Sequence, residues 1–138
     1  MIKQIISGGQ TGADRAALDV AIKFIIPHGG WIPKGRITEE GPLPDKYKLQ
    51  EMSTSSYPVR TEQNVIDSDG TLIISHGELT GGSAYTRKMA MKHGNRDLLY
   101  ACKLLSRDIH LDPDDVPPLI IKEVWKRLRE SHKLRVVK

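Results

Sequence analysis

Two glycine-rich turns contain the residues of this sequence that are best suited to bind a ligand. The first reads Ser-Gly-Gly-Gln-Thr-Gly-Ala-Asp at residues 7–14, between a short β-branched run at residues 1–6 and a helical pattern at residues 13–24. Glycines allow a sharp turn and leave backbone N–H groups exposed where the helix begins. Those N–H groups and the helix dipole both favour negative charge. This turn is therefore predicted to bind an anion, such as a phosphate or another oxyanion.

The second turn repeats the same order of strand, glycines and helix. Residues 69–75 are the clearest buried strand in the sequence, and Thr80, Gly81 and Gly82 follow it. A helical pattern resumes from Ser83. Thr80 and Ser83 are ordinary turn and cap residues that could also donate hydrogen bonds to an oxyanion.

Four cations could balance an anion near these turns: Lys34, Arg36, Arg60 and Arg87. A surface position explains each of them equally simply, and the functional interpretation is stronger for Lys34 and Arg60. Thr11 is predicted to cap the first helix. Asp14 is also interpreted as a cap, because a carboxylate beside an anion site would otherwise repel the ligand.

Alternating strands and helices must position these side chains. The first helix is predicted to stop at Pro27, and residues 28–33 to form a second strand that ends at Lys34 and Gly35. Residues 37–58 lack periodicity but contain residues able to pack, so they are predicted to form an ordered excursion. Residues 61–68 are predicted to form a short helix capped by Thr61.

The end of the chain is less regular. Gly94 is predicted to end the helix after the second turn, and residues 95–107 fit a helix or a strand equally well. A strand at residues 108–111, a helix beginning near residue 117 and a last strand at residues 134–137 are expected.

This order predicts one α/β domain over residues 1–138, with an open parallel sheet and helices on both faces. In such sheets ligands bind outside the carboxyl ends of the strands, near a topological switch point. The two glycine turns and the Lys34–Gly35 edge are expected to converge there.

The composition limits the classes of partner. The net charge is +4, but seven Lys and Arg residues against two acidic residues from residue 122 onward supply +5, which leaves −1 for the rest. With Trp125 as the single Phe, Tyr or Trp among them, these charges are more typical of a solvated face than of a nucleic-acid surface. The single Cys102 and the lack of zinc spacing predict a cytoplasmic protein. No apolar run reaches the roughly 18 residues of a membrane span.

Common catalytic and cofactor patterns are not matched. A dinucleotide fingerprint needs a glycine where Ser7 stands and an acidic residue near Lys34, which argues against a nicotinamide dehydrogenase. His28 and His76 lack a third ligand, so no metal site is predicted. No nucleophile–base pair stands out, and no catalytic residue is assigned.

Six short motifs occur together: S-G-G-Q-T-G-A-D at 7–14, P-H-G-G-W-I-P-K-G-R at 27–36, E-G-P at 40–42, R-T-E-x-N-V at 60–65, S-D at 68–69 and L-T-G-G at 79–82. In this order and spacing the chain resembles the family of proposed molybdenum-cofactor carrier proteins. The resemblance implies a Rossmann-like fold, related to the lonely-guy and lysine-decarboxylase-like superfamily and often found as a homo-oligomer.

The resemblance also implies a function and a set of contacts. The role proposed for the family is non-catalytic binding and protection of molybdenum cofactor, a pterin that carries a phosphate and an oxometal centre. By position, the binding residues carried over are Gly8, Gly9, Gln10, Thr11, Gly12, Lys34, Gly35, Arg60, Thr61, Asn64, Thr80, Gly81 and Gly82.

An enzyme is the alternative hypothesis. Related phosphoribohydrolases cleave the N-glycosidic bond of nucleoside monophosphates with a glycine turn followed by a catalytic Glu, and here Lys88 stands in that place. Glu62 or Glu78 would have to replace it. The chain also departs from the family pattern after residue 94, so one wall of the pocket is expected to be missing, to come from another subunit, or to differ.

Overall fold

The computed structural model describes residues 3–75, 78–94 and 97–102. The expected strands at residues 108–111 and 134–137 and the helix near residue 117 lie outside these ranges. Within them the chain forms three helices and eight strands: β1 (Ile5–Ile6), α1 (Ala13–Lys23), β2 (His28–Gly29), β3 (Trp31–Ile32), β4 (Ile37–Thr38), β5 (Gly41–Pro42), β6 (Gln50–Glu51), α2 (Tyr57–Ile66), β7 (Gly70–Ser75), α3 (Gly81–Lys92) and β8 (Asp97–Cys102).

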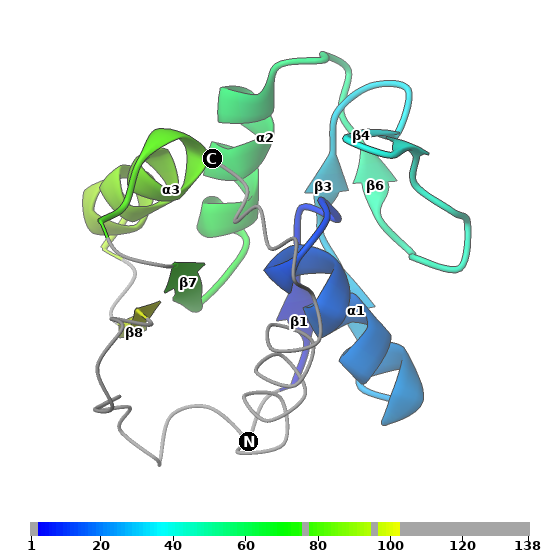
Figure 1. The fold of residues 1–138 in the computed structure, drawn as a ribbon, viewed down its shortest axis with the longest axis horizontal. Coiled ribbons are helices and arrows are strands. Elements are labelled where there is room, and N and C mark those ends of the chain that lie inside the picture. Colours follow the sequence, from blue (N-terminus) through cyan, green and yellow to red (C-terminus); the bar gives the residue numbers. More distant parts are fainter. Residues whose placement is uncertain (1–2, 76–77, 95–96, 103–138) are drawn as a thin grey trace.

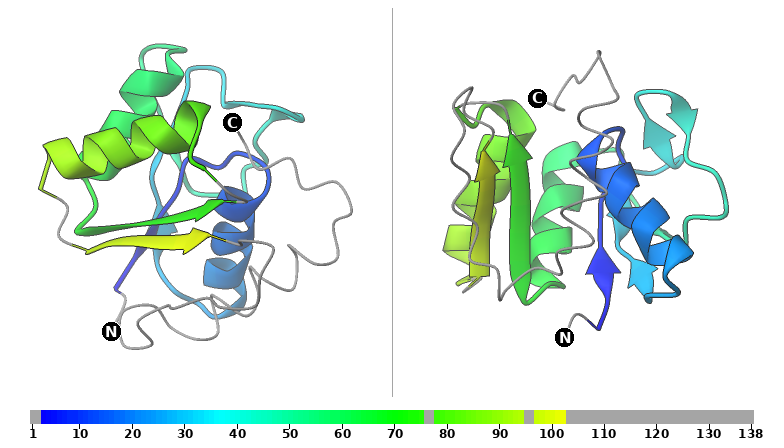
Figure 2. Two further views of the ribbon diagram at one scale, coloured as in Figure 1. Left: turned by 60° about the vertical axis from the view of Figure 1, so that its left-hand side comes forward. Right: turned by 60° about the horizontal axis from the view of Figure 1, so that its bottom comes forward.

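Parallel strands form the central layer (Figure 1). β1 pairs with β2, β3 with β6, and β7 with β8, all in parallel. In the right-hand view of Figure 2, β8, β7 and β1 follow one another across the molecule and point the same way, with α1 in front of the layer and α2 and α3 behind it. The expected parallel α/β architecture with helices on both faces is confirmed.

The predicted second strand is divided at Gly30, which has φ +125°. A Cβ atom on this residue would overlap the carbonyl oxygen of Ser7 and lie 2.9 Å from its nitrogen. The chain changes partner at this point, because β2 pairs with β1 whereas β3 pairs with β6. The absent side chain therefore allows the close approach at which the first glycine turn leaves the layer.

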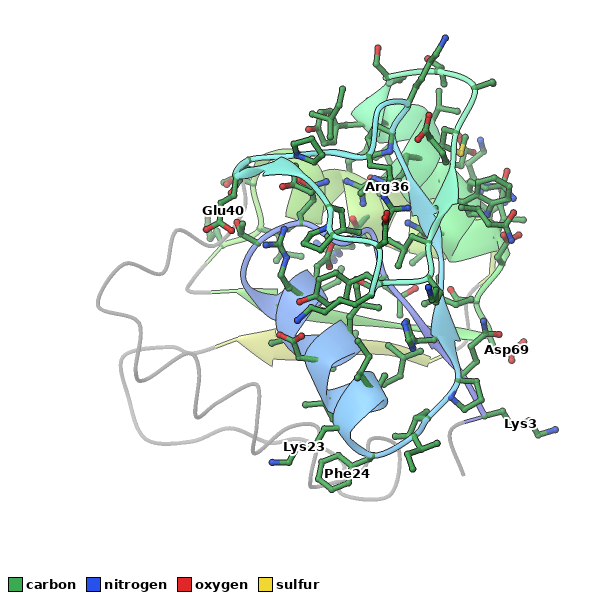
Figure 3. The ribbon with its side chains drawn as sticks, turned by 90° about the vertical axis from the view of Figure 1, so that its right-hand side faces the viewer. Lys3, Lys23, Phe24, Arg36, Glu40 and Asp69 are labelled. Carbon is green, nitrogen blue, oxygen red and sulfur yellow. The ribbon has the colours of Figure 1, made fainter. Side chains whose placement is uncertain are left out.

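The excursion after β3 is ordered, as expected, and Arg36 organises it. Its guanidinium donates to four backbone carbonyls, those of Leu43 (3.0 Å), Pro44 (3.2 Å), Tyr47 (3.0 Å) and Leu49 (3.1 Å). Figure 3 shows Arg36 within the loop that it holds. Because these bonds engage its nitrogens, Arg36 is a structural cation and not the ligand cation considered from the sequence.

The same excursion supplies much of the core. Leu43, Tyr47 and Leu49 are buried with Leu18 of α1 and Ile32 of β3. A second cluster joins α2 to α3 through Val65, Met89 and Ala90, with Tyr85 packed against it. The excursion is therefore part of the framework under the first turn, where a Cβ atom on Gly9 would meet Leu43 and Leu49.

One predicted helix start and one predicted helix cap are wrong. α2 begins at Tyr57, not at residue 61, because the hydroxyl of Ser56 accepts a hydrogen bond from the Val59 N–H (3.5 Å) and Pro58 occupies the first turn. Thr61 consequently lies inside the helix and does not cap it. At α1 the cap residue is Gly12, not Thr11.

The second turn and the segment after it agree better with expectation. α3 begins at Gly81, after Thr80 as cap residue, and ends at His93, which is followed by Gly94 with φ +65°. The sequence of residues 95–107 fits a helix or a strand equally well, and the structure shows the strand β8 within this range. Its pairing with β7 runs from Gly70 opposite Asp97 to Ser75 opposite Cys102.

Candidate anion-binding site

The side chains of the first glycine turn and of α1 engage several of the turn's own N–H groups. Gly9 N–H donates to the Ser7 hydroxyl (3.2 Å), and Gln10 N–H donates to Oδ2 of Asp14 (3.4 Å). The Ser7 hydroxyl in turn donates to the Asp14 carbonyl (3.0 Å). Asp14 is thus a cap for the turn itself, and these N–H groups are used within the chain.

Gly12 is the open part of this turn. It begins α1 at φ +82° without a side-chain hydrogen bond to the helix terminus. Apart from its neighbours in the chain, no atom of the described residues lies within 4 Å of the position that a Cβ atom would take on Gly12. Space for a ligand group therefore lies beside a helix N-terminus, where partial positive charge is concentrated.

Arg60 lies directly under the turn. A Cβ atom on Gly8 would overlap Nη1 of Arg60, and it would lie 2.7 Å from Cζ and 3.0 Å from Oδ2 of Asp14. Arg60 is only 9% exposed, and its guanidinium also lies 5.6 Å from the centre of the Tyr57 ring. Gly8 is therefore required so that a buried cation from α2 can pass beneath the turn.

Arg60 and Asp14 are electrostatically coupled. Burial raises the pKa of the Asp14 carboxyl, while the Arg60 charge and the N–H groups of Gln10 and Gly8 oppose that rise. Burial lowers the pKa of Arg60, and Asp14 opposes the fall. Nε of Arg60 is buried and has no hydrogen-bond partner among the described residues. The cation expected to balance a ligand is therefore largely balanced by Asp14.

Asp14→Asn should change the pH dependence of stability. Because the folded-state pKa of Asp14 is raised, its contribution to stability is greatest below the unfolded value of 3.8 and is lost as pH rises through the folded value. The stability of the variant relative to wild type should therefore increase from pH 4 to pH 7, as measured by urea unfolding. Asp69→Asn, at an exposed position, is the matched control. A relative stability that is constant with pH would contradict the coupling.

A hairpin made by β4 and β5 closes over the first turn. Gln10 donates from Nε2 to the Ile37 carbonyl (3.2 Å), and the Thr11 hydroxyl donates to Oε2 of Glu39 (2.5 Å). Arg15 forms an ion pair with Glu40 at 3.0 Å. In Figure 3, Glu40 lies towards the start of α1 and Phe24 at its other end. Glu39 was not found from the sequence because it matches no motif, and Glu40, although part of the E-G-P motif, was not among the candidate site residues.

Asn64 serves the framework. Its Oδ1 accepts from the Trp31 N–H (2.7 Å), and its Nδ2 donates to the Trp31 carbonyl (3.1 Å). The side-chain amide thereby provides both of the hydrogen bonds that a neighbouring strand would give to this residue. The binding role carried over to Asn64 stays a prediction, and the structure shows that its side-chain amide fixes β3.

Asn64→Ala should lower the free energy of unfolding by about 2–3 kcal/mol, since two partly buried backbone groups of Trp31 lose their partners. Gln63→Ala is the matched control, because Gln63 on the same helix donates an exposed hydrogen bond to Asp67, and its loss should change stability by less than about 0.5 kcal/mol. Chemical denaturation followed by circular dichroism would measure both. Equal losses in the two variants would contradict the role given to Asn64.

The remaining candidates of the first half differ in exposure. Lys34 and Gly35 are exposed after β3, with the Lys34 N–H bonded to the Thr54 carbonyl (2.9 Å) and Gly35 at φ +84°. Thr61 is half-buried in α2. The Lys34 side chain is therefore an accessible cation at the carboxyl end of a strand, as the sequence predicted.

The described residues of the second turn are exposed. Thr80, Gly81 and Gly82 are all exposed, and Thr80 makes no side-chain hydrogen bond to the helix terminus. The Gly82 carbonyl accepts from the Thr86 hydroxyl (2.9 Å) inside the helix. Because β1 and β7 point the same way, both glycine turns leave the layer at its carboxyl edge (Figure 2).

Glu62 and Glu78, the two carboxylates considered for the enzyme alternative, lie at different distances from the Gly81 turn. Glu62 accepts from Nζ of Lys92 (2.7 Å) and lies 2.8 Å from Nε2 of His93, at the carboxyl end of α3. Those bonds lower the pKa of Glu62. A twelve-residue helix is about 18 Å long, so Glu62 lies at the end of α3 opposite to the Gly81 turn. Glu62 is therefore unsuited to replace the catalytic Glu, whereas Glu78 is exposed just before that turn.

The described ranges contain neither a metal-binding cluster nor a membrane-spanning helix. No group of three His, Cys, Asp or Glu side chains suited to a metal ion is found there. His28 accepts a hydrogen bond from the Lys48 N–H (3.3 Å), and His76 lies outside the described residues. None of the three helices in these ranges has the length and apolar character needed to cross a bilayer.

Fold and site together define a Rossmann-like α/β domain with glycine turns at the carboxyl edge of parallel strands. The chain belongs to the circularly permuted YpsA SLOG family, whose model matches residues 5–112. It is 64% identical to a crystal structure from Syntrophus aciditrophicus named "Putative molybdenum carrier protein", with a TM-score of 0.69 over 72% of this chain. This chain spans 62% of the length of that protein. Comparison with curated proteins gave no match. The family resemblance drawn from the motifs is confirmed.

Proposed function

We propose that this protein binds molybdenum cofactor, or a similar phosphorylated anionic small molecule, as a carrier. One observation carries the proposal: the two helices that follow glycine turns, α1 and α3, begin without a side-chain cap, whereas α2 is capped by Ser56. Uncapped N-termini at one edge of a sheet leave N–H groups available for phosphate or molybdate-type oxygens. The name of the related crystal structure supports a ligand of this kind.

The candidate residues divide between contact and support. Those proposed to contact the ligand are exposed or half-buried at the carboxyl edge: Thr11, Gly12, Lys34, Gly35, Thr80, Gly81 and Gly82. Those proposed to shape the turn from below are Gly8, Gly9, Gln10, Arg60, Thr61 and Asn64. A cytoplasmic location and assembly as a homo-oligomer belong to the same proposal.

Calorimetry with molybdenum cofactor, molybdate and nucleoside monophosphates tests this function. We expect saturable binding of at least one of these ligands, with affinity that falls as salt is added because charge contributes to it. Circular dichroism before and after the titration would show that the protein is folded. A folded protein that binds none of the three ligand classes would overturn the proposal.

Gly12→Val should abolish this binding, since the side chain fills the open space beside the α1 terminus. Gly94→Val is the matched control, because Gly94 also has positive φ (+65°, against +82° at Gly12) and, apart from its neighbours in the chain, also has no described atom within 4 Å of a Cβ position. Both variants place a β-branched side chain at positive φ, so a loss of binding confined to Gly12→Val reports on the site. Unaltered affinity in Gly12→Val would contradict the proposed geometry.

A further inference from the structure

The two glycine turns differ in charge. α1 carries Asp14 in its first turn, whereas the first turn of α3 contains no acidic residue. Farther along α3, Arg87 and Lys88 are positively charged, and one exposed carboxylate, Glu78, precedes the turn. The anionic end of a ligand is therefore accommodated better at the start of α3 than at the start of α1.

The charges around the first turn leave one carboxylate in excess. Arg60 is electrostatically coupled to Asp14, and Arg15 pairs with Glu40 at 3.0 Å. In the part of the chain that the structure describes, Glu39 forms no ion pair, and its hydrogen-bond partner is the Thr11 hydroxyl. The Glu39 carboxylate, which has lone pairs available to accept hydrogen bonds, is thus held beside the open space at Gly12. Its negative charge would repel an anionic ligand group placed there.

The position of Glu39 is fixed by its hairpin. Thr38 donates from Oγ1 to the Gly41 carbonyl (2.6 Å) and accepts from the Glu40 N–H (3.2 Å), which closes the turn. Gln10 joins the hairpin to the glycine turn through the Ile37 carbonyl. The carboxylate is therefore presented by a braced element at the edge of the site, as recognition requires.

We propose that Glu39 binds two adjacent N–H donors on the heterocycle of the ligand, while the anionic group of the same molecule lies at Gly81 and Gly82. An ionised carboxylate is an acceptor only, and its two oxygens match a paired donor edge. The 2-amino-4-oxopyrimidine edge of a pterin or of guanine presents such a pair. This inference rests on the proposed function and specifies the substrate class and its orientation.

Paired nucleotides that differ by one amino group test the inference. We expect the wild-type protein to bind GMP at least tenfold more tightly than IMP, which lacks the 2-amino group, because a site built for a donor rejects the analogue without it. In Glu39→Gln the preference should fall to within about twofold, since the amide has one acceptor oxygen instead of two. 6-Hydroxymethylpterin phosphate serves as the second probe, and its affinity relative to GMP identifies the heterocycle.

Two control variants separate recognition from support of the turn. Glu51→Gln, an exposed carboxylate on β6, should keep the tenfold preference. Thr11→Val removes the hydrogen-bond partner of Glu39, so it should change the affinities for GMP and IMP by the same factor. If Glu39 only orders the turn, Thr11→Val would lose the preference as Glu39→Gln does, and the inference would be overturned.

The failures of the two proposals are distinguishable. Equal affinity for GMP and IMP, with binding still lost in Gly12→Val, would overturn the role of Glu39 and leave the anion site in place. A preference that survives in Glu39→Gln would do the same. A folded protein that binds neither nucleotide, nor the pterin phosphate, nor molybdate would overturn both the inference and the proposed function.

Discussion

Replacing Gly30 by alanine is expected to lower the free energy of unfolding by about 4 kcal/mol, from backbone strain at φ +125° and from overlap with a neighbouring strand end. The new methyl group would overlap the carbonyl oxygen of Ser7, an atom of the backbone that leads into the first glycine turn. Because that backbone is bonded to Gly29 through the Ser7 N–H (3.0 Å), it cannot move aside without loss of pairing. A loss of this size is a large part of the stability of a small domain.

Urea unfolding followed by circular dichroism would measure the loss. Gly41→Ala is the control, because Gly41 has φ +100° and no described atom within 4 Å of a Cβ position, so it reports strain without collision. We expect Gly41→Ala to lose about 1–2 kcal/mol. Equal losses at the two positions would show that the close approach of Gly30 to the turn is not what requires glycine.

Arg60→Met should lower the free energy of unfolding at pH 7 by about 3–5 kcal/mol, since it leaves the buried Asp14 carboxylate without its cation. The Arg60 charge opposes the rise in the pKa of Asp14, so its removal should raise that pKa further. A carboxyl group whose folded-state pKa is raised contributes less to the stability of the folded protein as pH increases. The loss caused by Arg60→Met should therefore be smaller at pH 4 than at pH 7.

Denaturation at the two pH values, combined with a double-mutant cycle, would test this coupling. Lys88→Met removes an exposed cation and should change stability by less than about 0.5 kcal/mol at either pH. Adding Asp14→Asn to Arg60→Met should recover part of the loss at pH 7, because the uncompensated charge is gone. Additive effects of the two substitutions, or a loss that does not vary with pH, would contradict the account.

Local sequence signals predicted the elements that glycine, proline and β-branched residues define. The buried strand before the second turn, the helix that follows it and its end at Gly94 agree with β7 and α3. The start of α2 was missed because the polar stretch before Pro58 gave no periodicity, although Ser56 supplies an ordinary cap. The division of the second strand was missed because it depends on contact between Gly30 and Ser7.

Candidate site residues could be placed by motif, but their roles depended on contacts across the chain. Gly8 is a glycine because of Arg60, fifty-two positions later, and no local pattern reports that relation. Asn64 fits the motif, yet its amide is bonded to Trp31. Glu39 belongs to no motif, and only the hairpin brings it to Thr11.

The central claim is that one anionic ligand is held across the two glycine turns. Titration of ¹⁵N-labelled protein with GMP and, separately, with molybdate would follow the backbone N–H signals of each turn directly. We expect saturable shifts at Gly12 and at Gly81 and Gly82 in the GMP titration, with Gly94 unchanged. Binding detected by calorimetry with no shift at either turn would contradict it.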